Sequence, residues 1–422
     1  MDKDQRRHRT IISPKKKVAF VCSGGAAKAG AFHLGVALAL QEKGFNFIGG
    51  LKRPEKEVLT TNLENNKDIR IYVGSSAGSI ICAYLASGYT LEQIFNSFLN
   101  KKNKDAGAEK DLKRLNYSTM FSLKNDSTSW LELLQPIASA LKPSSLTSFV
   151  QSLTKGSYNN VFRWKWLKWS GLFSTSGIEK YLREHVLPAN DFQSYEADFF
   201  VVATQLNHSK KVVFGKYHYS PPDEDKTVLY VNDISVSQAC AGSTALPLIF
   251  SPFPIKNDKG HVLYYFDGEI RDTLSTHVGF DAGADLIFAS YTHQPYHFSR
   301  EIGSLHEYGM PAIMIQALYL LIERKIQSAF SIQERISGAL DATSRFFKEH
   351  HLSDDLRKQC LDVLERKLGH KSGVDYIYIH PKSTDYQMFF GDHFNLSAKK
   401  LGETVRLGFR CAIDSLRRYE FS

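Results

Sequence analysis

The chain has 422 residues, a net charge of +9 and 43% hydrophobic residues, which is typical of a globular protein that buries a large core without disulfide staples. Its five cysteines are scattered and form no C-x-x-C pair, which excludes a zinc knuckle or a thioredoxin-like redox motif and favours reduced thiols in an intracellular protein. No run of eighteen apolar residues occurs, so we expect no membrane-spanning helix.

The positive charge is concentrated in two segments. Residues 1–17 carry seven Lys/Arg against two Asp and lack the apolar stretch of a secretory signal, so we expect a basic, flexible tail. Residues 101–168 carry twelve Lys/Arg against five Asp/Glu. Local basicity suits an anionic surface, either phospholipid headgroups or nucleic acid, or it is a solvated face with no partner. We expect a cytoplasmic or peripheral membrane protein.

The first third of the chain alternates strands with helices. An apolar run at residues 18–22 predicts a buried strand, and a helical pattern then extends to Lys43 and ends at Gly44. A second strand is predicted at 69–73, followed by a helix from Ala77 to about Ser87. Such units predict an α/β fold with a mainly parallel sheet and helices on both faces.

The remainder predicts an insertion and a return to the same sheet. Residues 98–170 are rich in Lys, Asn and Ser and predict an insertion. Strand character returns at residues 196–204, 211–215, 262–266 and 374–380, and residues 302–370 are strongly helical. We therefore predict one elaborated domain over residues 18–422.

The first chemical motif is a G-x-S-x-G at residues 74–78. Gly74 and Gly78 flank Ser76, with a predicted strand before the motif and a helix after it. This context exposes a nucleophilic serine on a strained turn above a sheet. The alternative is a tight strand-to-helix turn that merely needs small residues.

The second motif is the glycine-rich segment 23–30, also between a strand and a helix. Backbone amides at a helix N-terminus suit an anion. A P-loop is excluded because Ala31 and Phe32 stand where Lys and Ser/Thr are needed, and the dinucleotide fingerprint G-x-G-x-x-G is absent. An oxyanion hole remains as the interpretation.

The third motif is Asp267-Gly268, at the end of an apolar strand. A carboxylate hydrogen-bonded to the serine hydroxyl can act as general base, although Asp-Gly is also common in ordinary turns. His277 and His293 follow Asp267 and leave a Ser-His-Asp triad open. No H-E-x-x-H pattern or His/Cys cluster indicates a metal.

Together and in this order, the motifs resemble those of the patatin-like phospholipases. The glycine segment is similar to that family's Gly-Gly-Gly-x-Arg/Lys-Gly, and Asp267-Gly268 matches its Asp-Gly-Gly/Ala. Further similar segments are residues 30–36, 171–176, 201–204 and 242–247. The resemblance implies a three-layer α/β/α fold and a Ser–Asp dyad without histidine.

Carried onto this chain, the resemblance makes Ser76 the nucleophile and Asp267 its base. It implies an oxyanion hole from the amides of Gly24, Gly25 and Ala26, with Lys28 as the basic residue of the loop. His277 and His293 become ordinary surface or core residues.

The reaction implied is hydrolysis of lipid acyl esters through an acyl-enzyme, with glycerophospholipids as the expected substrates and neutral acylglycerols as the alternative. No cofactor or metal is expected, and a protein activator is compatible with the resemblance.

Three departures from the family pattern bear on activity. Ala26 replaces a glycine, which costs free energy if that position needs a positive φ. Ala29 is an extra residue, and Glu269 stands where a small residue is usual. A second carboxylate beside Asp267 would raise the pKa of one of the pair. The competing function is a lipid-binding protein that has lost catalysis.

The last feature is a cluster of tryptophans within the basic segment. Trp164, Trp166 and Trp169 are interleaved with Lys and Arg. Indole rings favour a membrane interface and cations attract anionic headgroups, so we predict membrane or substrate contact here. Packing against the core is the main alternative, and stacking on nucleic-acid bases is a lesser one.

Overall fold

The computed structural model describes residues 9–52, 67–101, 111–123 and 171–421, apart from 172, 217–226, 248, 258, 272 and 369–372. Residues 1–8 of the basic tail and most of the insertion at 98–170 therefore lie outside the described residues, as do Trp164, Trp166 and Trp169. The boundaries assigned to these segments, and the membrane role of the tryptophans, remain predictions.

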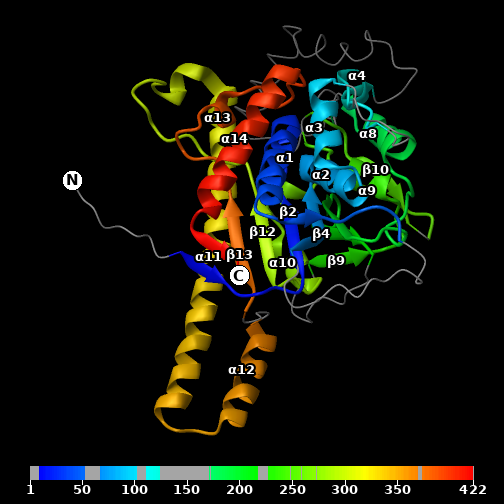
Figure 1. The fold of residues 1–422 in the computed structure, drawn as a ribbon. Coiled ribbons are helices and arrows are strands. Elements are labelled where there is room, and N and C mark those ends of the chain that lie inside the picture. The colour runs from blue at the N-terminus through cyan, green and yellow to red at the C-terminus, as the bar shows by residue number, and fades with distance from the viewer. Residues whose placement is uncertain are drawn as a thin grey trace, which may run out of the picture.

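A 10-stranded, mainly parallel sheet forms the centre of the described part of the chain (Figure 1). Its main path runs in the order β10-β11-β7-β4-β2-β12-β13, while β3 pairs with β4 and β8 joins β7 to β9. The strands are β2 (Val18–Cys22), β3 (Asn46–Phe47), β4 (Asp68–Ser75), β7 (Asp198–Gln205), β8 (Lys210–Gly215), β9 (Val228–Val231), β10 (Phe253–Lys256), β11 (Val262–Asp267), β12 (Leu286–Ser290) and β13 (Asp375–Ile379).

Helices cover both faces of this sheet. The larger core lies on one face and includes residues of α1 (Ala26–Glu42), α2 (Ala77–Ala86), α3 (Leu91–Leu99), α8 (Ser176–Tyr181), α9 (Val236–Ser243) and α14 (Ala398–Leu416). The smaller core lies on the other face and includes residues of α10 (Thr276–Asp281) and α11 (Gly309–Glu349). The predicted three-layer α/β/α fold is therefore confirmed.

Close packing of α1 against α14 depends on two glycines. A Cβ on Gly35 would lie 2.0 Å from the Val405 carbonyl oxygen, and one on Gly408 would lie 2.2 Å from that of Phe32. The two backbones approach this closely because neither glycine carries a side chain. This contact ties the C-terminal helix to the helix that follows the glycine loop.

Several short elements also occur in the described chain. Strands β1 (Thr10–Ile12) and β14 (Tyr419–Phe421) pair in parallel and hold the two ends of the described chain together. Strands β5 (Ser122–Leu123) and β6 (Phe173–Ser174) also pair, and α4 (Tyr117–Met120) and α13 (Gln387–Phe390) are single turns.

A helical hairpin extends away from the body. The C-terminal part of α11 and α12 (Asp354–Leu368) extends beyond the sheet (Figure 1). The helical character predicted for residues 302–370 is confirmed over both helices. Among the described residues, no helix is long and apolar enough to cross a membrane.

Candidate active site

Ser76 occupies a strained turn between β4 and α2. Its φ of 51° and ψ of −126° are unfavourable for a residue with a side chain and cost on the order of 1–3 kcal/mol. Gly74 and Gly78 are required by space, since a Cβ would lie 2.5 Å from Ser79 Cα or 2.4 Å from the Cys22 carbonyl oxygen, respectively. The glycines of the G-x-S-x-G motif thus let the turn pack against its own helix and the neighbouring strand.

Hydrogen bonds hold the Ser76 backbone in this conformation. The Ser76 amide donates to Ser243 Oγ at 2.8 Å, and that hydroxyl donates to the Val202 carbonyl oxygen at 2.6 Å. The Ser79 hydroxyl donates to the Ser76 carbonyl oxygen at 2.6 Å. Ser243 belongs to a segment noted for its resemblance, but nothing in the sequence assigns it this positioning contact.

Asp267 reaches Ser76 from an antiparallel strand. In the sheet register Asp267 is opposite Ala203 of β7, while Ser75 is opposite Val202, so the dyad residues lie at nearly the same level. Burial raises the pKa of Asp267 to about 6, against hydrogen bonds from the Ser76 side chain and the Glu269 amide that lower it. A carboxylate with this pKa is suited to accept the Ser76 proton near neutral pH.

The glycine loop runs from β2 into the N-terminus of α1. Gly25 has a φ of 128° and Ala26 a φ of 58°, so the replacement of glycine by Ala26 falls at a position that does need a positive φ. The extra Ala29 is accommodated in the first turn of α1. Amides at this helix end have no partner within the helix and can receive an anion.

Glu269 occupies part of this loop. The Gly24 amide donates to Glu269 Oε1 at 2.8 Å, and a Cβ on Gly24 would lie 2.6 Å from Glu269 Cγ and 2.8 Å from Ser76 Cβ. Gly24 is therefore wedged between the nucleophile and this carboxylate. An oxyanion at Gly24 would have to share or displace Glu269, whereas the amides of Gly25 and Ala26 are not bonded to Glu269.

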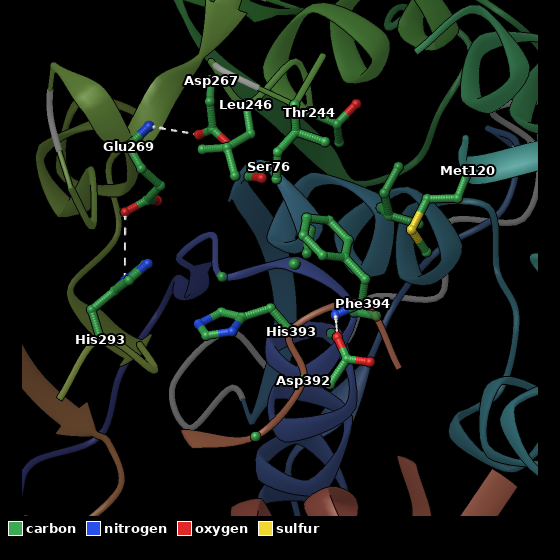
Figure 2. Close-up of a pocket in the computed structure, with 18 of the residues that line it drawn as sticks. Ser76, Met120, Thr244, Leu246, Asp267, Glu269, His293, Asp392, His393 and Phe394 are labelled. Carbon is green, nitrogen blue, oxygen red and sulfur yellow. Dashed lines mark hydrogen bonds and ion pairs between the residues drawn. The ribbon is translucent and has the colours of Figure 1, made fainter. Parts of the chain in front are cut away.

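Of the two histidines that could complete a triad, His277 lies outside the pocket lining and His293 lies in the pocket wall. His277 on α10 bonds Lys211, with 2.6 Å between Lys211 Nζ and His277 Nε2. His293 is buried in the pocket wall, with its Nδ1 4.0 Å from Glu269 Oε2 (Figure 2). Burial, together with the smaller effect of the charge of Lys28, lowers the pKa of His293 to about 3, so its neutral form is favoured.

Lys28 does not line the pocket. Its buried ammonium donates to the Met388 carbonyl oxygen and lies 5.9 Å from the centre of the Tyr319 ring. Burial lowers the pKa of Lys28 to about 7, while the charge of Asp392 opposes this change. The basic residue of the loop thus fastens it to the segment at 388–393, where the Lys28 amide also donates to the His393 carbonyl oxygen at 3.4 Å.

Ser76 and Asp267 line a pocket of about 590 Å³ whose walls are largely apolar (Figure 2). Part of the wall comes from helices beside the dyad, through Ile80, Ile81, Tyr84, Met120 and Ile178. The opposing wall comes from α11 and the segment before α14, through Ala312, Ile315, Leu318, Tyr319, Phe389, Phe390 and Phe394. This second wall, including Asp392 and His393, could not be predicted from the sequence, because no spacing or motif links it to Ser76.

The sequence model of the patatin-like phospholipase family matches residues 20–279 of this chain. The match covers more than half of the chain, and the chain belongs to this family. No curated protein sequence is a significant match. In the described part of the chain, no three His, Cys, Asp or Glu side chains gather as a metal site would require.

Proposed function

We propose that this protein is a serine hydrolase that cleaves acyl esters of glycerophospholipids with Ser76 as nucleophile and Asp267 as its base. The observation that carries the proposal is the position of a buried Ser–Asp pair in an apolar pocket of about 590 Å³. A cavity of this size accommodates a substantial part of an acyl chain, and its apolar side chains favour hydrocarbon over polar substrates.

In the first half of the reaction, Ser76 Oγ attacks the ester carbonyl carbon while Asp267 takes the hydroxyl proton. The carbonyl oxygen gains negative charge, which the amides of Gly25 and Ala26 stabilise at the N-terminus of α1. The bond to the alcohol then breaks, and Asp267 returns its proton to the leaving oxygen. The products of this half are the free alcohol and an acyl-enzyme on Ser76.

In the second half, water attacks the acyl carbonyl with Asp267 again acting as base. The tetrahedral intermediate collapses, Ser76 recovers its proton and the fatty acid is released. Both halves require the Asp267 carboxylate to be ionised when the nucleophile attacks. The acyl chain remains against apolar residues such as Ile80 and Ile315 throughout.

A fluorophosphonate probe tests the nucleophile, because fluoride is displaced by an activated serine. We expect one adduct, on Ser76, that disappears in Ser76→Ala. Ser75 is the matched control, since it is adjacent and equally buried but belongs to β4. Ser75→Ala should still be labelled, and an adduct mapped to Ser75 would show that the wrong serine has been assigned.

A non-catalytic lipid-binding protein is the second candidate, and the occupation of the Gly24 amide by Glu269 favours it. Absence of both labelling and turnover of a chromogenic fatty-acyl ester would support this alternative. If the chain is active, analysis of products from a mixed lipid extract separates phospholipid from neutral-lipid substrates.

A further inference from the structure

The first turns of α11 carry no charge. From Gly309 to Ile322 every residue is uncharged, and all but Gln316 are apolar or aromatic. This stretch lies outside residues 20–279, which match the family. The two faces of this helix have different surroundings.

One face of this stretch points into the protein. Ile315, Tyr319 and Ile322 line the pocket, and Tyr319 packs with Tyr296 and Phe389 in a small separate core. This face holds the helix over the pocket and does not explain the apolar residues on the other face.

The outward face forms an exposed apolar stripe, which consists of Met310, Ile313, Met314, Ala317 and Leu321. Their spacing places them in one row along three turns of helix. The exposed fractions of Met310, Met314 and Leu321 are 68%, 56% and 62%. Large apolar side chains gathered this way are unfavourable in water and indicate a partner.

The stripe is continuous with the pocket. Tyr308 and Leu318 both line the pocket and remain 47% and 40% exposed, so the apolar wall extends from inside the pocket to the surface. A partner that covers the stripe would therefore also contact the pocket opening. Among partners, a lipid bilayer is the one whose own hydrocarbon could pass from the stripe into the pocket.

We propose that the exposed stripe of α11 lies in the surface of a lipid bilayer and brings the pocket opening to the acyl chains, an inference that rests on the proposed lipid-ester substrate. The stripe is about 17 Å long at 1.5 Å per residue, too short to span a bilayer but sufficient to lie in its interface. The exposed Arg324, one turn beyond Leu321, supplies a cation for an anionic headgroup at the end of the stripe.

Vesicle flotation tests this without requiring turnover. In a Ser76→Ala chain, Met314→Glu combined with Leu321→Glu should weaken binding to phosphatidylcholine–phosphatidylserine vesicles by about tenfold or more, because two apolar side chains that would lie in the bilayer become charged. The matched control is Leu356→Glu with Val363→Glu on α12, whose side chains are 53% and 49% exposed and lie on the hairpin. It should bind as the parent does.

The proposal would be overturned if the stripe variant bound vesicles as the parent does, or if the control variant were weakened equally. Melting temperatures verify that both variants fold. If the parent is a dimer, the stripe variant is a monomer and both float equally with vesicles, the stripe would instead be the contact with a second copy of the chain. In chains that retain Ser76, turnover of a short soluble ester should be unchanged by the stripe variant. If no chain hydrolyses that ester while the flotation difference persists, the catalytic proposal fails and the bilayer contact stands.

Discussion

The two walls of the pocket are built in different ways. The wall with Ser76, Gly25 and Asp267 is held by hydrogen bonds between sheet, turn and helix ends, and its glycines leave no space for a side chain. The opposing wall of α11 and residues 389–394 is held by a small aromatic core and is partly exposed. The comparison suggests that the first wall determines whether a reaction occurs and the second determines which lipid is presented.

The largest expected effect comes from the dyad. We expect Ser76→Ala and Asp267→Asn each to reduce kcat for a soluble fatty-acyl ester by about a thousandfold or more, because neither residue can act without the other. For the same reason the double variant should be no slower than either single variant. Circular dichroism should show the same fold in all three.

Histidine variants provide the control for this prediction. His277→Ala and His293→Ala should keep activity within about tenfold of the parent, since neither histidine is hydrogen-bonded to Ser76 and a packing contact is all that is lost. A folded but inactive His293→Ala would replace the dyad with a triad.

The next largest effect is expected from pH. Because Asp267 must be ionised to accept a proton and its pKa is raised to about 6, kcat/KM should be constant above that pH. It should fall about tenfold for each pH unit below 6, reaching about a hundredfold loss at pH 4. A flat profile between pH 4 and 7 would show that Asp267 is not the base.

The raised pKa of Asp267 also affects stability, in the opposite direction to activity: as the pH rises through about 6, activity increases and this contribution to stability is lost. A carboxyl group whose pKa is raised by folding favours the folded state below its unfolded pKa, and this contribution is lost as the pH rises through about 6. Asp267→Asn should therefore be more stable than the parent at pH 7, by up to about 3 kcal/mol for two pH units. Denaturant unfolding should show that this difference disappears below pH 4.

Glu269 should have a smaller effect, in the direction of higher activity. Glu269→Gln keeps an acceptor for the Gly24 amide but removes a negative charge beside the developing oxyanion, so we expect kcat to rise by about tenfold. Glu269→Gly, which restores a small residue, should raise it at least as much. A decrease in both variants would mean that Glu269 is needed to hold Gly24 in place.

Much of the catalytic wall could be predicted from the sequence because its parts are local. A strand, a small-residue turn and a helix must follow one another for Ser76 to be exposed, and the same holds for the glycine loop. The sequence also indicated that Ala26 would cost free energy if its position needs a positive φ, and its φ is positive. Strand β13 could be placed in the sheet because residues 376–379 are a short run of aromatic and β-branched side chains.

The other wall could not be predicted, because its contacts join residues distant in sequence. Nothing in the sequence places Lys28 against Met388 or His393 beside the glycine loop. A second carboxylate beside Asp267 was expected to raise the pKa of one of the pair. The pKa of Asp267 is raised, but burial is the main cause, and the hydrogen bond from the Glu269 amide lowers it. Helix α14 and strand β12 were likewise not assigned from sequence.

The smallest effect is expected on the second wall and concerns substrate choice. Ala312 lines the pocket from α11, where a larger side chain would occupy space otherwise available to the acyl chain. Ala312→Phe should lower kcat/KM for long-chain esters by about five- to tenfold relative to a short-chain ester, since each lost methylene contact is worth about 0.8 kcal/mol. Ala339→Phe is the control, because Ala339 is exposed further along the same helix, outside both the pocket lining and the exposed stripe. Equal loss on short and long esters in Ala312→Phe would indicate a disturbed dyad, and unchanged selectivity would mean that the acyl chain binds elsewhere in the pocket.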